Sequence, residues 1–134
     1  MKKIIGFGLA LLCLTACSND DDSPDISLDQ IAKRWYNVSY VVAGKTVPYD
    51  GHENCGKDYL EMLTGGGAKE VDIFDCQQEP KTANGTYTAS DKTLTITLDG
   101  VMKVYTIKKL NSKSLEIELT SINPKITYIY TSTP

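Results

Sequence analysis

The chain has 134 residues, of which 14 are Lys or Arg and 17 are Asp or Glu, so its formal charge is −3. This acidic balance argues against a nucleic-acid partner, because phosphate groups favour a basic surface. It argues equally against docking on anionic lipid through charge.

The first 16 residues have the pattern of a secretory signal. Lys2 and Lys3 precede an apolar run from Ile4 to Leu14, which is too short to span a membrane. The chain then reads Leu14-Thr15-Ala16-Cys17, which resembles the lipobox of bacterial lipoproteins. The resemblance implies cleavage before Cys17 and attachment of lipid to its sulfur and new amino group. A plain signal peptide that is cut nearby is the alternative.

Residues 17–26 follow as a polar segment rich in Asp. Cleavage before Cys17 leaves 118 residues (134 minus 16) with a formal charge of −5 (12 minus 17), enough for one domain. The segment cannot bury a core, and we expect a solvated tether between the lipid and the domain. Its acidic run also resembles a surface-export signal of some Gram-negative lipoproteins. We therefore expect an outer-membrane lipoprotein, with display on the cell surface as the sharper alternative to a spacer role.

A domain over residues 27–134 begins with a short predicted helix from Ser27 to Arg34. Ser27 can cap this helix, and Leu28 and Ile31 share one face. Residues 36–42 then alternate in the manner of a half-buried strand that ends at Gly44.

Two cysteines remain for a disulfide after Cys13 leaves with the signal and Cys17 takes lipid. Cys55 and Cys76 flank two predicted strands, residues 59–64 and 69–74, which are joined by a run of three glycines. Facing residues of an antiparallel hairpin have a constant index sum, and 55 plus 76 centres the hairpin within that glycine turn. We predict a Cys55–Cys76 disulfide in an oxidising compartment. A zinc site is the competing hypothesis, but two cysteines and His52 fall short of a ligand set.

The remaining chain reads as short strands with short turns. Asn84-Gly85 opens a predicted strand over residues 86–88, and a turn at residues 90–92 leads to the alternating strand 93–98. Asp99-Gly100 is a two-residue hairpin signal that returns the chain through residues 101–107. Two further strands, residues 115–119 and 126–130, follow turns at residues 111–113 and 123–124. This pattern predicts an all-β fold, an eight-stranded antiparallel up-and-down barrel with the N-terminal helix closing one end.

A short helix, a tryptophan that opens the first strand and an eight-stranded meander resemble the lipocalins, and more narrowly the lipocalin-like domain of bacterial lipoproteins. The resemblance covers residues 27–132. The matching features are Lys33-Arg34-Trp35, the two cysteines, Gly85-Thr86-Tyr87, Leu94-Thr95-Ile96-Thr97, and Tyr105-Thr106-Ile107 with Leu110 and Leu115. Lys33 stands where the family has a glycine. In such a barrel the helix and Trp35 close one end, and contact of Trp35 with a ligand is the alternative.

The connections of such a barrel fall at two ends. The glycine turn and residues 111–113 share the end of the helix. The loops 44–56 and 77–83 are the longest, so the mouth and the disulfide should lie at the opposite end.

We expect the barrel to bind a small apolar or lipid-like ligand, with fold analogy as the main support. The inward set would include Leu94, Ile96, Leu98, Leu115, Ile117, Leu119 and several tyrosines. The alternative is a filled barrel that acts as a surface interaction module, through loop residues such as Lys45, Tyr49, Asp50, His52 and Glu53.

An enzyme is not expected, because the chain has one histidine and no serine in a nucleophile-elbow sequence. Gly65-Gly66-Gly67 lacks the lysine and the helix of a phosphate loop. Asp50, His52 and Glu53 are a weak signal for a metal. We therefore expect no cofactor and no metal, and a monomer whose contact with the membrane is its lipid anchor.

Overall fold

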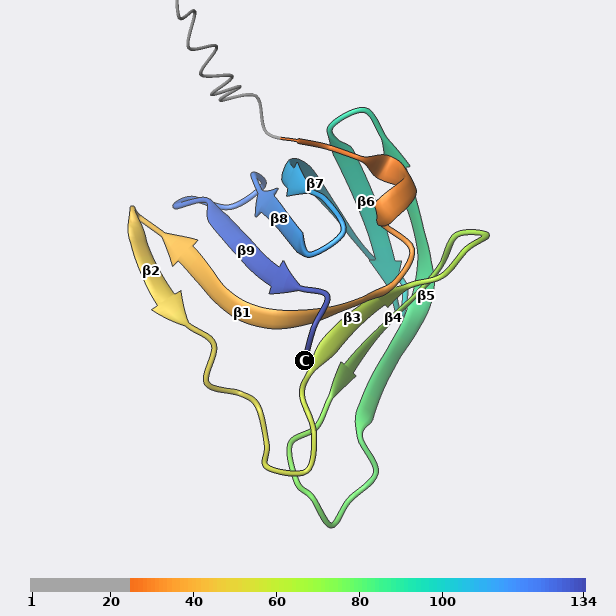
Figure 1. The fold of residues 1–134 in the computed structure, drawn as a ribbon, viewed down its shortest axis with the longest axis vertical. Coiled ribbons are helices and arrows are strands. Elements are labelled where there is room, and N and C mark those ends of the chain that lie inside the picture. Colours follow the sequence, from red (N-terminus) through yellow and green to blue (C-terminus); the bar gives the residue numbers. More distant parts are fainter. Residues whose placement is uncertain (1–24) are drawn as a thin grey trace, which may run out of the picture.

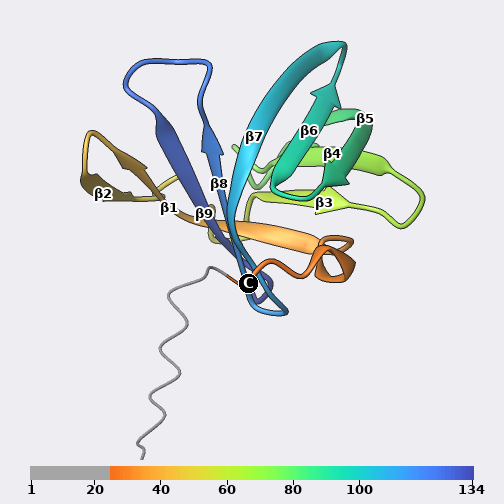
Figure 2. The same ribbon diagram turned by 90° about the horizontal axis from the view of Figure 1, so that it is seen from above.

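The computed structural model describes residues 25–134, and the predicted signal, Cys17 and most of the tether lie outside this part of the chain. The described chain forms one antiparallel sheet that closes on itself (Figures 1 and 2). Its nine strands are β1 Arg34–Val42, β2 Lys45–Pro48, β3 Tyr59–Met62, β4 Gly67–Asp72, β5 Lys81–Ser90, β6 Thr93–Leu98, β7 Val101–Leu110, β8 Ser114–Leu119 and β9 Ile126–Thr131.

Eight of these strands make the barrel. From β3 to β9 each strand pairs with the next, and β9 pairs with β1 to close the ring. The ninth strand, β2, pairs only with the second half of β1. It lies along the same edge of β1 as β3, which pairs with the first half of that strand. The predicted eight-stranded barrel is therefore confirmed, and β2 is an additional strand within the segment 44–56 that the sequence predicts as a loop.

The predicted N-terminal helix is wrong in kind and length. Only one 3₁₀ turn, Leu28–Gln30, is present, and Arg34 already belongs to β1. The side chain of Ser27 makes no capping hydrogen bond. Instead its backbone N–H donates to the carbonyl of Leu110, and the N–H of Leu110 donates to the carbonyl of Asp25. These bonds lay the segment across the end of β7, which leaves too few residues before β1 for an α-helix.

A second correction concerns Asn84-Gly85, which lies inside β5 rather than at its start. Gly85 pairs with Leu98, and a Cβ on Gly85 would clash with the carbonyl oxygen of Thr97. The glycine thus permits close approach of two strands, and β5 begins at Lys81, five residues before the predicted start at residue 86.

The barrel has a packed end, where the buried side chains gather, and an open end. The buried cluster contains Ile31, Trp35, Leu60, Met62, Ala68, Leu94, Ile96, Ile107, Leu110, Leu115 and Ile117. It lies beneath the 3₁₀ turn, whereas the loops 49–58 and 73–80 lie together at the opposite end (Figure 1). No helix in residues 25–134 is long and apolar enough to cross a membrane.

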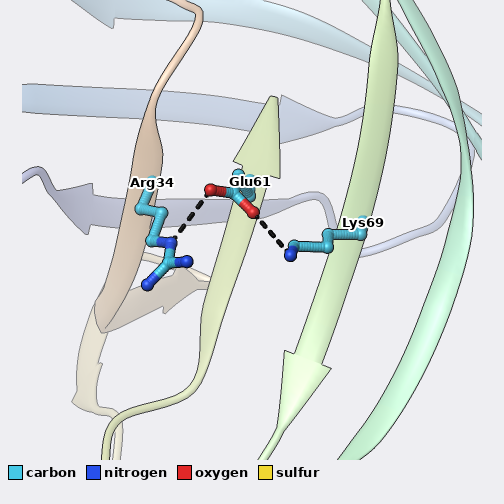
Figure 3. A network of polar contacts seen from close by, with 3 residues as sticks. All are labelled: Arg34, Glu61 and Lys69. Atoms are coloured by element: carbon cyan, nitrogen blue, oxygen red, sulfur yellow. Dashed lines mark hydrogen bonds and ion pairs between the residues drawn. The ribbon is translucent and has the colours of Figure 1, made fainter. Parts of the chain in front are cut away.

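On the outer face, a polar network ties three neighbouring strands. Figure 3 shows the carboxylate of Glu61 on β3 between Arg34 on β1 and Lys69 on β4, with N···O distances of 2.9 and 2.8 Å. Burial opposes ionisation of Glu61, but the hydrogen bonds from Lys69 and Arg34 outweigh it and lower its pKa. The Arg34 guanidinium also lies 4.6 Å from the centre of the Tyr59 ring. This network reinforces the junction between β1, β3 and β4.

Candidate functional site: a cavity at the open end of the barrel

The packed end is organised around Trp35. Its side chain is completely buried, and its Nε1–H donates to the carbonyl of Ile31 at 2.9 Å. The Lys33 ammonium lies 5.4 Å from the centre of the indole ring and donates to the carbonyl of Ser112. The 3₁₀ turn, the indole and the β7–β8 turn therefore meet at one end, as predicted. The contribution of Trp35 to closure of the barrel stays a prediction.

Above this packed end lies a cavity of about 320 Å³, which we call the main cavity. Buried side chains of Leu60 and Ile96 form part of its apolar wall. The complete lining is Leu60, Glu70, Lys81, Ala83, Ile96, Leu98, Asp99, Val101, Lys103, Tyr105 and Tyr130. The lining thus combines apolar and aromatic side chains with four charged residues from different strands and turns.

A second hollow of about 270 Å³, the side cavity, adjoins the main cavity. Both are lined by Glu70, Lys103, Tyr105 and Tyr130, so these four residues stand at the junction. The other residues around the side cavity are Asn37, Tyr49, Asp58, Tyr59, Val71, Asp72 and Tyr128. Together the two hollows place a group of tyrosines against a charged rim.

Strand register brings the inner tyrosines together. Tyr128 and Tyr130 on β9 pair with Ile117 and Leu115 on β8, which fixes both on the inner face. The rings of Tyr105 and Tyr128 lie 6.3 Å apart with their planes at 80°. None of the hydrogen bonds among the described residues involves the hydroxyls of Tyr105, Tyr128 or Tyr130. These phenols are therefore available to a molecule in the cavity.

Burial is the main cause that raises the pKa of Tyr105, Tyr128 and Tyr130 above the usual range of tyrosine. The negative charge of Glu70 adds to this rise in all three residues. The phenols therefore stay neutral donors throughout the physiological range.

A buried polar network supports the wall beside the side cavity. Asp58, only 4% exposed, accepts hydrogen bonds from the Tyr49 hydroxyl and from the backbone N–H of Ile73. The Nδ1 atom of His52 accepts from the N–H of Asp58, so Nε2 carries the proton and donates to the carbonyl of Asn37 at 2.7 Å. Burial and the carboxylate of Asp58 raise the pKa of Tyr49. This network holds the loop 49–58 against the barrel.

The loop residues that gave a weak metal signal, Asp50, His52 and Glu53, do not form a metal-binding group. His52 has both ring nitrogens engaged with the backbone, whereas Asp50 and Glu53 are exposed. Residues 25–134 contain no group of three or more His, Cys, Asp or Glu side chains that is placed to bind a metal. The loop surface expected for an interaction module also changes, because Lys45 lies in β2 and Tyr49 and His52 turn partly inward.

The predicted disulfide between Cys55 and Cys76 is confirmed, with a Cα–Cα distance of 5.6 Å. The predicted register is wrong by one residue, because Tyr59 pairs with Val71 and the index sum is 130 rather than 131. Both cysteines lie beyond the ends of β3 and β4, in exposed positions of the loops 49–58 and 73–80. The bond therefore fastens the two long loops at the open end rather than two paired strands.

The predicted inward residues all face the interior, but they divide into two groups. Leu94, Leu115, Ile117 and Leu119 are buried and line neither cavity. Ile96 and Leu98 line the main cavity. The prediction missed Glu70 and Lys103, although alternation places each on the inner face of its strand.

Comparisons with known proteins agree on this architecture. The family described as a lipocalin-like domain matches residues 31–117. A crystal structure of a lipocalin-like protein from Bacteroides uniformis is similar with a TM-score of 0.61 and 14% identity, covering 77% of this chain and 98% of that one. An uncharacterized protein from Bacteroides eggerthii is similar with a TM-score of 0.59 and 12% identity, covering 76% and 98%.

None of the curated proteins matches this sequence closely enough to count as a relative. The two structural similarities support the barrel fold, and the family match covers well over half of the sequence. This chain belongs to the family of lipocalin-like domains.

Proposed function

We propose that this protein is a membrane-anchored lipoprotein whose barrel holds a small apolar or lipid-like molecule. The observation that carries the proposal is the main cavity, which is open to the loop end and has Leu60, Ile96 and Leu98 in its wall. Binding sites for small molecules are concave, mostly apolar and supplied with a few polar groups. The main cavity has this composition.

The packed end limits the size of the ligand. The cavity of about 320 Å³ is near the lower end of the range for small-molecule sites, roughly 300–1,000 Å³. Below it, Trp35, Leu94 and Leu115 are fully buried against one another, so the ligand cannot extend to the closed end. The occupant is therefore a compact molecule rather than a long acyl chain.

The test is native mass spectrometry of residues 17–134 with the substitution Cys17→Ser, which removes the lipid site. The protein is exported behind a cleavable secretory signal and purified without detergent from a bacterial envelope. We expect a bound small molecule that is lost on denaturation. The variant Ala83→Trp places a large side chain in the main cavity and should abolish this mass. Thr86→Trp is the matched control, because Thr86 is exposed on the outer face of the same strand.

Two results would count against the proposal. The bound mass could persist in the Ala83→Trp protein, which would place the ligand elsewhere. Alternatively, the protein could carry no mass and fail to respond to a panel of small apolar compounds. That second result would favour the alternative, in which the barrel is a scaffold and the loops 49–58 and 73–80 recognise a partner.

The anchor and the location are proposals that the sequence alone supports. Cys17→Ser in the full chain should move the protein from the membrane fraction to the soluble fraction and remove the mass of the lipid. Replacement of Asp20, Asp21 and Asp22 by Asn should abolish protease accessibility on intact cells if the acidic run directs surface export. Unchanged accessibility would leave the run as a spacer.

A further inference from the structure

The junction of the two cavities has a chemistry that an apolar barrel does not need. Glu70 faces the interior opposite Leu60 and Ala83 of the neighbouring strands, yet it is solvent-exposed. A carboxylate on the inner face of a barrel is costly in a packed core and is tolerated where the interior is wet or occupied by a polar group. Glu70 makes no ion pair within 4 Å among residues 25–134.

Aromatic rings stand beside this carboxylate. Tyr105 and Tyr128 lie 6.3 Å apart with nearly perpendicular planes, and both line the side cavity together with Glu70. Tyr130 lines both cavities. In this T-shaped pair the edge of one ring covers part of the face of the other, and the remaining ring faces, which carry negative potential, can attract an organic cation beside the carboxylate.

The charge of the whole lining has the same sign. Across the two cavities four carboxylates (Asp58, Glu70, Asp72 and Asp99) face two ammonium groups (Lys81 and Lys103). Asp58 is already committed to hydrogen bonds, which leaves three acids at the rim. The excess of negative charge raises the local concentration of cations.

On these grounds we propose that the barrel selects a ligand with an ammonium head group, which lies in the side cavity against the rings of Tyr105 and Tyr128 with Glu70 as its counter-ion. This inference rests on the proposed function, since the apolar part of the same ligand would occupy the main cavity beside Leu60 and Ile96.

Lys103 is the group that could oppose this selection, because it lines both cavities. Within residues 25–134 its ammonium neither pairs with Glu70 nor lies over a tyrosine ring, since the cation–π contacts there belong to Lys33 and Arg34. The cation position beside the tyrosine rings is therefore not filled by this lysine. Replacement of Lys103 by Met should consequently strengthen the binding of a cation.

The experiment compares three probes of equal chain length, octyltrimethylammonium, octanoate and octanol, by isothermal titration calorimetry at low salt. Residues 17–134 with Cys17→Ser serve as the reference protein. We expect the cation to bind about tenfold more tightly than the other two probes, and Glu70→Gln to remove about tenfold of its affinity while octanol is unaffected. Glu116→Gln is the matched control, because it removes the same charge from the outer face of β8.

The outcomes separate the two proposals. Tightest binding of octanoate that is lost in Lys103→Met would overturn the cation inference and leave a ligand-binding barrel. Equal loss of affinity in Glu70→Gln and Glu116→Gln would also overturn it, because the effect would then be one of net charge. Failure of all three probes to bind would count against both proposals.

Discussion

Replacement of Trp35 by Ala tests the closed end of the barrel most directly. A buried aromatic side chain removes about 150–250 Å² from water, which corresponds to roughly 4–6 kcal/mol at about 25 cal/mol per Å². That figure is an upper bound, since the unfolded chain already shields part of this surface. Because Trp35 is completely buried, its full area counts.

The substitution also removes a hydrogen bond. The carbonyl of Ile31 would lose the Nε1–H of the indole, at a cost of about 1 kcal/mol. Truncations of buried aromatics typically cost 3–5 kcal/mol, so we expect a loss of about 4 kcal/mol in the free energy of unfolding. Domains of this size are stable by roughly 5–15 kcal/mol, so the variant should fold with little margin.

The assay is urea denaturation followed by far-ultraviolet circular dichroism. Tryptophan fluorescence is unsuitable because Trp35 is the only tryptophan in the chain. Trp35→Phe retains an aromatic ring but not the donor, and it should lose roughly 2 kcal/mol. Val104→Ala is the control, because Val104 is 46% exposed on the outer face and should change stability by no more than about 0.5 kcal/mol. A loss below about 1 kcal/mol for Trp35→Ala would refute the role of the indole in closing the barrel.

Three further predictions concern the disulfide, a buried phenol and the outer ion pairs. Replacement of Cys55 and Cys76 by Ser should cost about 3 kcal/mol of unfolding free energy in the chain-entropy model, and the variant should no longer respond to reductant; an equal response of both proteins would contradict this. Burial raises the pKa of Tyr130. The contribution of its neutral phenol to the free energy of unfolding is therefore complete below about pH 10 and is lost as the pH rises further. Tyr130→Phe should therefore flatten the alkaline fall of stability, measured by urea titrations across that range, and an unchanged slope would argue against it. The lowered pKa of Glu61 stabilises the fold above about pH 4.3, and this contribution is lost as the pH falls. Glu61→Gln should cost less than about 1 kcal/mol at pH 7, because its cationic partners are partly exposed, and should weaken the acid dependence; a wild-type acid profile would be inconsistent with this.

The parts of the fold that the sequence predicts are those in which local chemistry and tertiary packing agree. Leu94, Ile96 and Leu98 alternate strictly, and each faces the interior. Asp99 and Gly100 form the expected two-residue turn, with φ values of 48° and 82°. A turn that needs positive φ at both positions favours such a pair, so no distant contact is required to specify it.

The errors arise where a tertiary contact determines the local structure. Asn84-Gly85 has the composition of a turn, but Gly85 is needed where β5 approaches Thr97 on β6. The segment around Ser27 has a weak helix pattern, but its backbone is captured by β7. The strand β2, Lys45–Pro48, is short and mostly exposed, and it forms because β1 extends beyond β3 and offers a free edge. None of these contacts can be read from a short window of sequence.

The candidate site was predictable in part, through the same alternation that predicts the barrel. Ala68, Glu70 and Asp72 share one face of β4, and Val101, Lys103 and Tyr105 share one face of β7. On β4, Ala68 lies toward the packed end, and Glu70 is the next inward residue toward the loops 49–58 and 73–80. On β7, Tyr105 lies toward the packed end, and Lys103 is the next inward residue toward the same loops. A charge at an inward position is therefore the sequence signal that the interior has become open. What alternation cannot supply is the pairing across the barrel, which sets Tyr128 of β9 against Tyr105 of β7 and brings both rings beside Glu70. The residue pattern within single strands therefore predicts that the barrel has an open end. The ligand preference of that end depends on contacts between strands that only the closed barrel brings together.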